Sequence, residues 1–193
     1  MSGPTDDRLR KVVHEFHLLS EMPIAPAVVE GGRRWKPAEG LKRERLADAP
    51  PLASSASARL VQMRQIARSF TASMEFDGRW ELRLLPQPLF RYGHDDSEVA
   101  DGAIFCYVWP KGTDPEFVLL VECRRDDREL AWHFAPVRFT TRELWLKRNG
   151  REEWHAEPHQ EPTDRLSTMI YTVDSARSIP KPATPAAEQE EPK

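Results

Sequence analysis

The stretch from Trp80 to Arg124 contains two almost uninterrupted apolar segments, AIFCYVW at 103–109 and FVLLV at 117–121, joined by the polar turn PKGTDPE. Neither segment alternates between apolar and polar residues, so we expect both faces of both strands to be covered. The short connections between strand-like segments favour an antiparallel meander over βαβ units. The two segments are therefore predicted to be the central strands of a sheet.

Apolar residues at helical spacing predict two helices outside this stretch. The first runs from about Thr5 to Glu21, and the second begins near Ser54 and extends its apolar stripe as far as Phe70 and Met74. The expected fold class is α+β. It consists of a mostly antiparallel twisted sheet of about five to seven strands, one long helix packed on it, and a peripheral N-terminal helix.

Composition divides the chain into four parts. Residues 1–21 are the N-terminal amphipathic helix, and 22–53 are a linker rich in proline and glycine. The α+β core domain occupies 54–178, and the Pro-, Ala-, Glu- and Lys-rich segment 179–193 is predicted to be a disordered tail. A chain of 193 residues with 39% hydrophobic content can bury one ordinary domain core.

The dipeptide Asn-Gly at 149–150 lies between two strand-like segments and predicts a two-residue type I′ hairpin. Its register places Lys147 opposite Glu152 and Trp145 opposite Trp154. Pro136 cannot donate a ladder hydrogen bond, so the segment 131–139 is predicted to be an edge strand, a bulge or two short strands. A further strand is expected at 167–173.

Two tryptophans on one face of an exposed hairpin, and the apolar face of a peripheral helix, are candidates for binding a partner. The residues concerned are Trp145, Trp154, Leu9 and Phe16. The competing interpretation is that these side chains fill the core, as large aromatic residues usually do.

Three charged residues at strand ends are the catalytic candidates. Asp101 opens one predicted strand, and Glu122 and Arg124 close the next. The arrangement is similar to the D…(D/E)-x-K pattern of metal-dependent nucleases, in which two carboxylates bind Mg²⁺ and a lysine positions or activates water. Arginine is too basic to accept the proton. A Mg²⁺-dependent nuclease or phosphodiesterase using Asp101 and Glu122 therefore stays an alternative function.

His155 and His159 have a spacing seen in zinc sites and lie among three glutamates. Pro158 breaks the helix that would align them, and no cysteine or histidine quartet accompanies them. We therefore expect an exposed loop rather than a metal site. The sequence also lacks a phosphate-binding glycine motif and a nucleophile elbow, so no cofactor is expected.

The formal net charge is −3, from 28 basic and 31 acidic residues, which argues against nucleic acid as a partner chosen by bulk charge. No run approaches the roughly 20 apolar residues of a membrane span, so no membrane association is expected. Cys106 and Cys123 lie in predicted strands, and no basic, apolar leader precedes them. We expect buried reduced thiols in a cytoplasmic protein.

The segment from Leu60 to Trp154 resembles a domain found in uncharacterised bacterial proteins. That domain has the pattern LRLLPxPLxRY, DGAxF, GTDPExxLLxE-R and G-R-E-x-W, which is matched here by ELRLLPQPLFRY, DGAIF, GTDPEFVLLVECR and NGREEWH. The resemblance implies a bacterial protein and a domain boundary. It carries no activity and no functional residues.

The leading hypothesis is a non-catalytic interaction or accessory module with a protein partner, either a second copy or another chain. It rests on the missing catalytic motifs, the apolar face of the predicted peripheral helix and the paired tryptophans. Besides the nuclease, a second alternative is a small-ligand-binding sheet or barrel, which requires a roomy cavity lined by the central strands.

Overall fold

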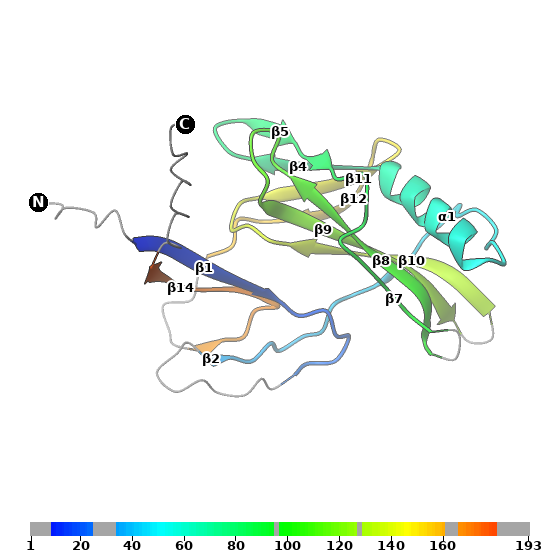
Figure 1. Ribbon diagram of the computed structural model, residues 1–193, viewed down its shortest axis with the longest axis horizontal. Helices are drawn as coiled ribbons and strands as arrows, with labels where there is room; N and C mark the ends of the chain where they lie inside the picture. Colours follow the sequence, from blue (N-terminus) through cyan, green and yellow to red (C-terminus); the bar gives the residue numbers. More distant parts are fainter. Residues whose placement is uncertain (1–8, 25–33, 95–96, 127–128, 161–165, 181–193) are drawn as a thin grey trace, which may run out of the picture.

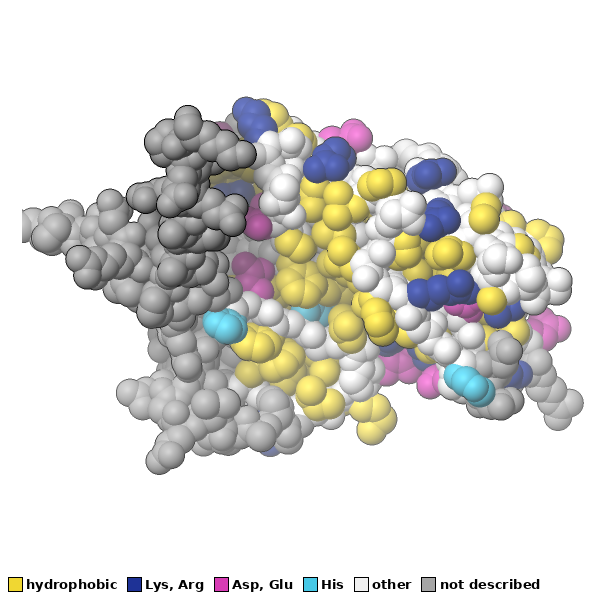
Figure 2. Space-filling model, in the orientation of Figure 1, with side chains coloured by type: hydrophobic (Ala, Val, Ile, Leu, Met, Phe, Trp, Pro, Cys, Tyr) yellow, Lys and Arg dark blue, Asp and Glu magenta, His cyan; other side chains and the backbone are white. Residues whose placement is uncertain are grey.

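The computed structural model describes residues 9–24, 34–94, 97–126, 129–160 and 166–180. These residues form one α-helix and fourteen strands in four sheets, three of them antiparallel. Figure 1 shows strands β1, β2 and β14 together at one end of the molecule and helix α1 at the other. On the face drawn in Figure 2, hydrophobic side chains gather across the middle of the molecule. The predicted mostly antiparallel architecture is confirmed.

A six-stranded antiparallel sheet forms the centre of the fold, in the order β3–β10–β9–β8–β6, with β7 also paired to β8. Its strands are β3 (Glu44–Arg45), β6 (Arg83–Leu84), β7 (Phe90–Tyr92), β8 (Val99–Val108), β9 (Pro115–Asp126) and β10 (Glu129–Arg138). Strands β8 and β9 contain the two apolar segments, so the prediction of central strands is confirmed.

A four-stranded sheet, in the order β12–β11–β4–β5, continues from the first one. Its strands are β4 (Phe70–Glu75), β5 (Arg79–Glu81), β11 (Leu144–Arg148) and β12 (Arg151–Ala156). Only Leu82 separates β5 from β6, so the two sheets join there and curl into a half-barrel. The opposite side of the half-barrel lies between β10 and β12, which are not paired with each other.

Both faces of β9 are buried, as the lack of alternation predicts. Phe117, Leu119 and Val121 belong to the main core, which they share with α1 (Ala56–Arg68) and the four-stranded sheet. Val118 and Leu120 point the other way into a smaller cluster with Leu41 of the 36–43 segment. Continuous apolar sequence therefore corresponds to a strand packed on two sides.

The remaining strands pair segments from the two ends of the chain. β1 (Leu9–His17) pairs antiparallel with β14 (Tyr171–Pro180), and β2 (Arg34–Trp35) pairs parallel with β13 (Leu166–Ser167). Leu18 donates a backbone hydrogen bond to the carbonyl of Ile170, which continues this contact. The small sheets thus bring residues far apart in sequence to one side of the half-barrel (Figure 1).

The predicted N-terminal helix is wrong, because residues 9–17 in its middle form strand β1. The sequence LRKVVHEFH fits a helical stripe, but its adjacent valines are β-branched and its partner β14 is more than 150 residues away. Residues 1–8, which include its expected capping residues, lie outside the described residues. A local pattern cannot reveal a partner at that distance, so the 3.6-residue period is misleading here.

The second helix exists but is shorter than predicted. It spans 13 residues, with the Ser55 hydroxyl accepting the Ala58 backbone N–H as N-cap, and it ends at Arg68. Phe70 and Met74, which continue its apolar stripe in sequence, instead lie on the buried face of β4. Their alternation with exposed residues is the strand period rather than the helical one.

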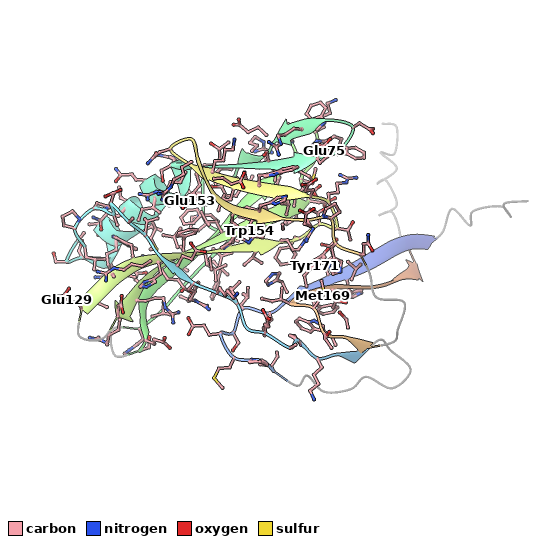
Figure 3. The ribbon with its side chains drawn as sticks, turned by 180° about the vertical axis from the view of Figure 1, so that it is seen from behind. Glu75, Glu129, Glu153, Trp154, Met169 and Tyr171 are labelled. Carbon is pink, nitrogen blue, oxygen red and sulfur yellow. The ribbon has the colours of Figure 1, made fainter. Side chains whose placement is uncertain are left out.

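The segment 22–53 is not a free linker over its described residues 34–53. Leu41 and Leu46 are buried, at 5% exposure each, and β3 adds to the edge of the central sheet beside β10. Figure 3, seen from behind, shows this light-blue segment running across the sheets on the viewer's side. The segment is part of the fold and forms a wall of the cleft described below.

The Asn149-Gly150 turn is confirmed, since both residues have positive φ and Lys147 pairs with Glu152. The predicted Trp145–Trp154 pair is wrong, because the register shifts between Leu146 and Lys147. Trp154 is therefore opposite Leu146. The extra residue, Glu153, forms a bulge, and a slip of one residue moves each following side chain to the other face.

The segment 131–139 is neither bulged nor divided into two short strands, because β10 runs from Glu129 to Arg138 without a break. It is the second strand of the sheet rather than its edge strand, since β3 lies outside it, but β3 pairs only with residues 133 and 134 and leaves Pro136 unpaired on that side. The strand expected at 167–173 is divided between β13 and β14. Of the predicted tail 179–193, the first two residues belong to β14, which ends at Pro180. The rest of the tail lies outside the described residues. Cys106 and Cys123 are buried thiols as predicted, and burial raises the pKa of Cys106 to about 11.

Candidate functional site

Asp101 lies at the start of β8 and is bound by two arginines. Arg59 of α1 donates from Nε to Oδ2 at 2.9 Å, and Arg91 of β7 donates to both carboxylate oxygens at 2.8 and 2.6 Å. Burial opposes ionisation, but these hydrogen bonds and charges outweigh it and lower the pKa of Asp101. The Asp101 carboxylate therefore links helix α1 to strands β7 and β8 of the central sheet.

Glu122, on β9, is fully buried and is bound by three side chains. Arg43 donates from Nε at 2.7 Å, the Tyr92 hydroxyl donates at 2.5 Å, and Arg124 donates from Nη1 at 3.0 Å. Burial raises the pKa of Glu122, whereas these donors and the positive charge of Arg43 lower it by more. The network joins the 36–43 segment to the central sheet.

The two carboxylates of the nuclease hypothesis point to opposite faces of the sheet. Asp101 is directly opposite Cys123, and Gly102 is directly opposite Glu122, so the two side chains alternate across the pleat. Arg124 lies on the Glu122 side and is bonded to it. Asp101, Glu122 and Arg124 thus do not form a shared metal site, because each acid is already neutralised by arginine.

The two histidines of the zinc hypothesis lie in different surroundings. His155 receives contacts at both ring nitrogens, with Glu143 at 2.7 Å from Nε2 and Glu157 at 3.8 Å from Nδ1. His159 is buried, with its ring edge-on to Tyr171 at 4.9 Å.

Within the described residues, the group Glu143, His155 and Glu157 has ligand atoms within 4.8 Å of one another. However, the two glutamates use different nitrogens of one imidazole. Because those nitrogens point in opposite directions, this geometry fits a hydrogen-bonded ion pair better than a chelate around one ion.

The four partner-binding candidates are also separated. Trp145 is on the outer face of the hairpin, stacked on His155 at 5.3 Å and covered by the Arg79 guanidinium at 3.5 Å. Trp154 is on the inner face, 5.6 Å from Phe117. Phe16 is 43% exposed and lies 6.1 Å from Trp35, and for Leu9 only the backbone pairing with Pro180 is described.

A cleft of about 510 Å³ lies where the half-barrel is open, between β12 and the part of β10 that β3 does not pair with. Trp154 and Ala156 line it from β12, and Pro136 and Arg138 line it from β10. The 38–44 segment and residues 168–170 close its outer side, with Met169 at the surface. Figure 3 shows Trp154 in the middle of the molecule and Tyr171 and Met169 beside it, toward the small sheets. Its lining is mainly apolar, as in typical small-molecule sites.

Two polar side chains belong to the cleft wall. Arg138 is 8% exposed, and burial lowers its pKa. The Nδ1 of His17 lies 2.9 Å from the Leu18 carbonyl, which fits an Nδ1–H donor, and burial lowers the pKa of His17 to about 4. At neutral pH the histidine is therefore uncharged.

Sequence reasoning missed this cleft, although Trp154 was among its candidates. The cleft is formed by five segments that only the tertiary fold brings together. The sequence signal that points toward it is Pro136, which predicts an edge strand and hence an unpaired side of the sheet. No local pattern identifies the second edge or the segment that covers it.

Comparisons with protein-family models, with curated proteins and with solved structures gave no match to this chain. Within the described part of the chain, no helix is both long and apolar enough to cross a membrane. Any function is therefore inferred from the chemistry of the chain itself.

Proposed function

We propose that this protein is a binding protein rather than a catalyst, and that the cleft between β10 and β12 holds an apolar small molecule. The observation that carries the proposal is the cleft itself, about 510 Å³ and mainly apolar, at the open side of the half-barrel. This size is within the range of small-molecule sites, about 300–1,000 Å³. The proposal shares its ligand class with the small-ligand alternative considered from the sequence, but that alternative placed the cavity at the central strands, whereas this cleft is lined from β10 and β12.

The chemistry of the charged residues supports binding over catalysis. A carboxylate that acts as a general acid, a general base or a metal ligand must have an oxygen available to the substrate or the ion. Asp101 and Glu122 instead accept hydrogen bonds from arginine, and their pKa values are lowered because these bonds and charges outweigh the effect of burial. Both therefore stay ionised and occupied at neutral pH.

The cleft also connects with the core, which allows a ligand to replace water with apolar contacts. Trp154 packs on the main core through Phe117 and exposes another part of its surface to the cleft. On the opposite wall, Leu41 belongs to the smaller apolar cluster and Ile170 packs against it. A ligand in this position buries apolar area, at about 25 cal/mol per Å².

The test is a titration of the full chain with N-phenyl-1-naphthylamine, a neutral apolar dye whose fluorescence increases in apolar sites. We expect saturable binding with one dye per chain. The variant Ala156→Trp fills the cleft and should weaken binding at least tenfold. The matched control is Val61→Trp on the exposed side of α1, where Val61 is 50% exposed, and it should bind as the parent does. Absence of saturable binding, or equal loss in both variants, would contradict the proposal.

A protein partner is the second candidate. Several apolar side chains of the 16–24 segment are exposed, among them Met22 at 72% and Ile24 at 42%. Exposed apolar groups in one segment are typical of interaction surfaces. Light scattering after size-exclusion chromatography tests self-association. We expect the parent chain to have a mass above that of one chain, and the double variant Met22→Ser, Ile24→Ser to have the mass of a monomer. A monomeric parent at all concentrations would contradict self-association.

A further inference from the structure

Arg138 is a buried cation bound entirely by backbone carbonyls and one ring. Its Nε, Nη1 and Nη2 donate to the carbonyls of Thr140, Glu157 and Arg142 at 2.9, 2.9 and 2.6 Å. Its guanidinium also lies 5.6 Å from the centre of the Tyr171 ring. Among the residues that the structure describes, no carboxylate forms an ion pair with it. Arg138 thus differs from Arg43, Arg59 and Arg124, each of which meets an acid.

Carbonyl hydrogen bonds satisfy donors but leave the positive charge uncompensated. Taking an ion out of water costs several kcal/mol, and an opposite charge in the same site offsets that cost. The lowered pKa of Arg138 follows from its burial and fits a missing counter-ion. Glu15 accepts the Tyr171 hydroxyl at 2.9 Å, and among the described residues it forms no ion pair with Arg138.

The guanidinium retains donors for a ligand. Arginine has five N–H groups, and three of them are used by the carbonyls. One N–H therefore remains on Nη1 and one on Nη2. They match in number the two oxygens of a carboxylate, which arginine commonly binds through two parallel hydrogen bonds.

The rest of the cleft restricts the ligand further. Its interior is apolar around Trp154, Leu41 and Ile170, and His17 adds a neutral ring nitrogen. The charges at its mouth, Glu39, Lys42 and Glu44, are exposed and include both signs. The single buried charge is therefore the feature that selects a ligand, and it selects an anion.

We propose that the cleft binds an amphiphilic monocarboxylate of the fatty-acid type, with its carboxylate at Arg138 and its apolar body along Trp154 and Leu41. This inference rests on the proposed function, since it names the ligand class of the same cleft. The competing interpretation is that Arg138 only orders the 140–142 loop by holding its carbonyls. That interpretation predicts no preference for an anionic ligand.

The experiment compares three ligands that have nearly equal linear alkyl chains and different head groups: decanoate, 1-decanol and decyltrimethylammonium. Each displaces N-phenyl-1-naphthylamine from the full chain at neutral pH, below the critical micelle concentration. We expect decanoate to bind at least tenfold more tightly than 1-decanol, and the cation to bind more weakly than both. The comparison needs no variant, so it does not depend on how Arg138 affects folding.

A variant then assigns the preference to one side chain. Arg138→Gln should bring the affinity for decanoate down to that for 1-decanol while 1-decanol binding is retained. Circular dichroism confirms that the variant is folded. Arg138→Lys, which keeps the charge, should keep part of the preference. Equal binding of decanoate and 1-decanol by the parent chain would overturn this inference and leave the proposed function standing. Failure of the dye and of all three ligands to bind would instead overturn the proposed function.

Discussion

Replacing Glu122 with glutamine removes the one fully buried carboxylate from the network that it forms with Arg43, Arg124 and Tyr92 in the described part of the chain. The other two carboxylates that meet these arginines, Glu21 and Glu98, are partly exposed. The substitution keeps the size of the side chain but changes one acceptor oxygen into a donor NH₂ group. At least one of the three donors that now point at the carboxylate, at 2.5 to 3.0 Å, would then face another donor. The folded state loses both a charge and a hydrogen bond.

The magnitude follows from burial. Glu122 is 0% exposed, and the side chains of Arg43 and Arg124 are 10% and 8% exposed, so water replaces little of the lost charge. Glu21 still contacts both arginines, but its side chain is 44% exposed and so compensates their charge less than the buried carboxylate does. Removing one partner of a buried ion pair costs about 3–5 kcal/mol. In a chain of this size, 1 kcal/mol lowers the melting temperature by about 2–4 °C, so a fall of roughly 6–20 °C is expected.

Urea unfolding followed by tryptophan fluorescence measures the change at neutral pH. The matched control is Glu153→Gln, the same chemical change at an ion pair whose Arg151 is 73% exposed, and it should cost less than about 1 kcal/mol. Because the folded pKa of Glu122 is lowered, its contribution exists at neutral pH and disappears as the pH falls through that folded pKa. The difference between parent and Glu122→Gln should therefore shrink in acid. A loss below 1 kcal/mol at neutral pH, or a difference independent of pH, would refute the reasoning.

Three further substitutions test other parts of the fold. His17 has a pKa of about 4 when folded and 6.5 as the reference, so the unfolded chain binds a proton first as the pH falls between these values. As the pH falls through this range, the free energy of unfolding of the parent chain should therefore drop by about 3 kcal/mol more than that of His17→Gln. Urea titrations at several pH values measure the difference. Gly102→Ala places a Cβ 2.9 Å from the Tyr92 ring, so a loss of about 1–3 kcal/mol is expected in the same assay, and an unchanged midpoint would show that the ring moves freely. Gly150→Ala meets no atom within 4 Å but has φ +83°, so a loss of about 1 kcal/mol in thermal unfolding would come from backbone strain alone.

Two parts of the fold could be predicted from the sequence because the information for them is local. Two continuous apolar runs identify β8 and β9 of the central sheet. Asn149-Gly150 identifies the β11–β12 hairpin of the four-stranded sheet from two residues with positive φ. Strand β1 could not be predicted in the same way. Its partner β14 lies at the other end of the chain, and its apolar residues also fit a helical stripe.

The candidate site was harder to predict than the fold. Charged residues at strand ends suggested catalysis, but Asp101 and Glu122 alternate across the pleat and each meets arginines from distant segments. A one-residue bulge at Glu153 reversed the face of Trp154 and turned an expected surface pair into one wall of the cleft. Neither the arginine partners nor the bulge leaves a local signal in the sequence.

The most direct test of ligand binding in the cleft is the signal of the Trp154 indole N–H in ¹H–¹⁵N spectra of the full chain during titration with decanoate. Among the described tryptophans, Trp154 alone lines the cleft, whereas Trp145 is stacked under Arg79 and Trp80 and Trp109 pack together elsewhere. Assignment comes from a Trp154→Phe spectrum. We predict a saturable shift of the Trp154 signal with the other indole signals nearly unchanged. A titration that leaves the Trp154 signal in place, or that shifts the signals of Trp80 and Trp109 instead, would contradict the account.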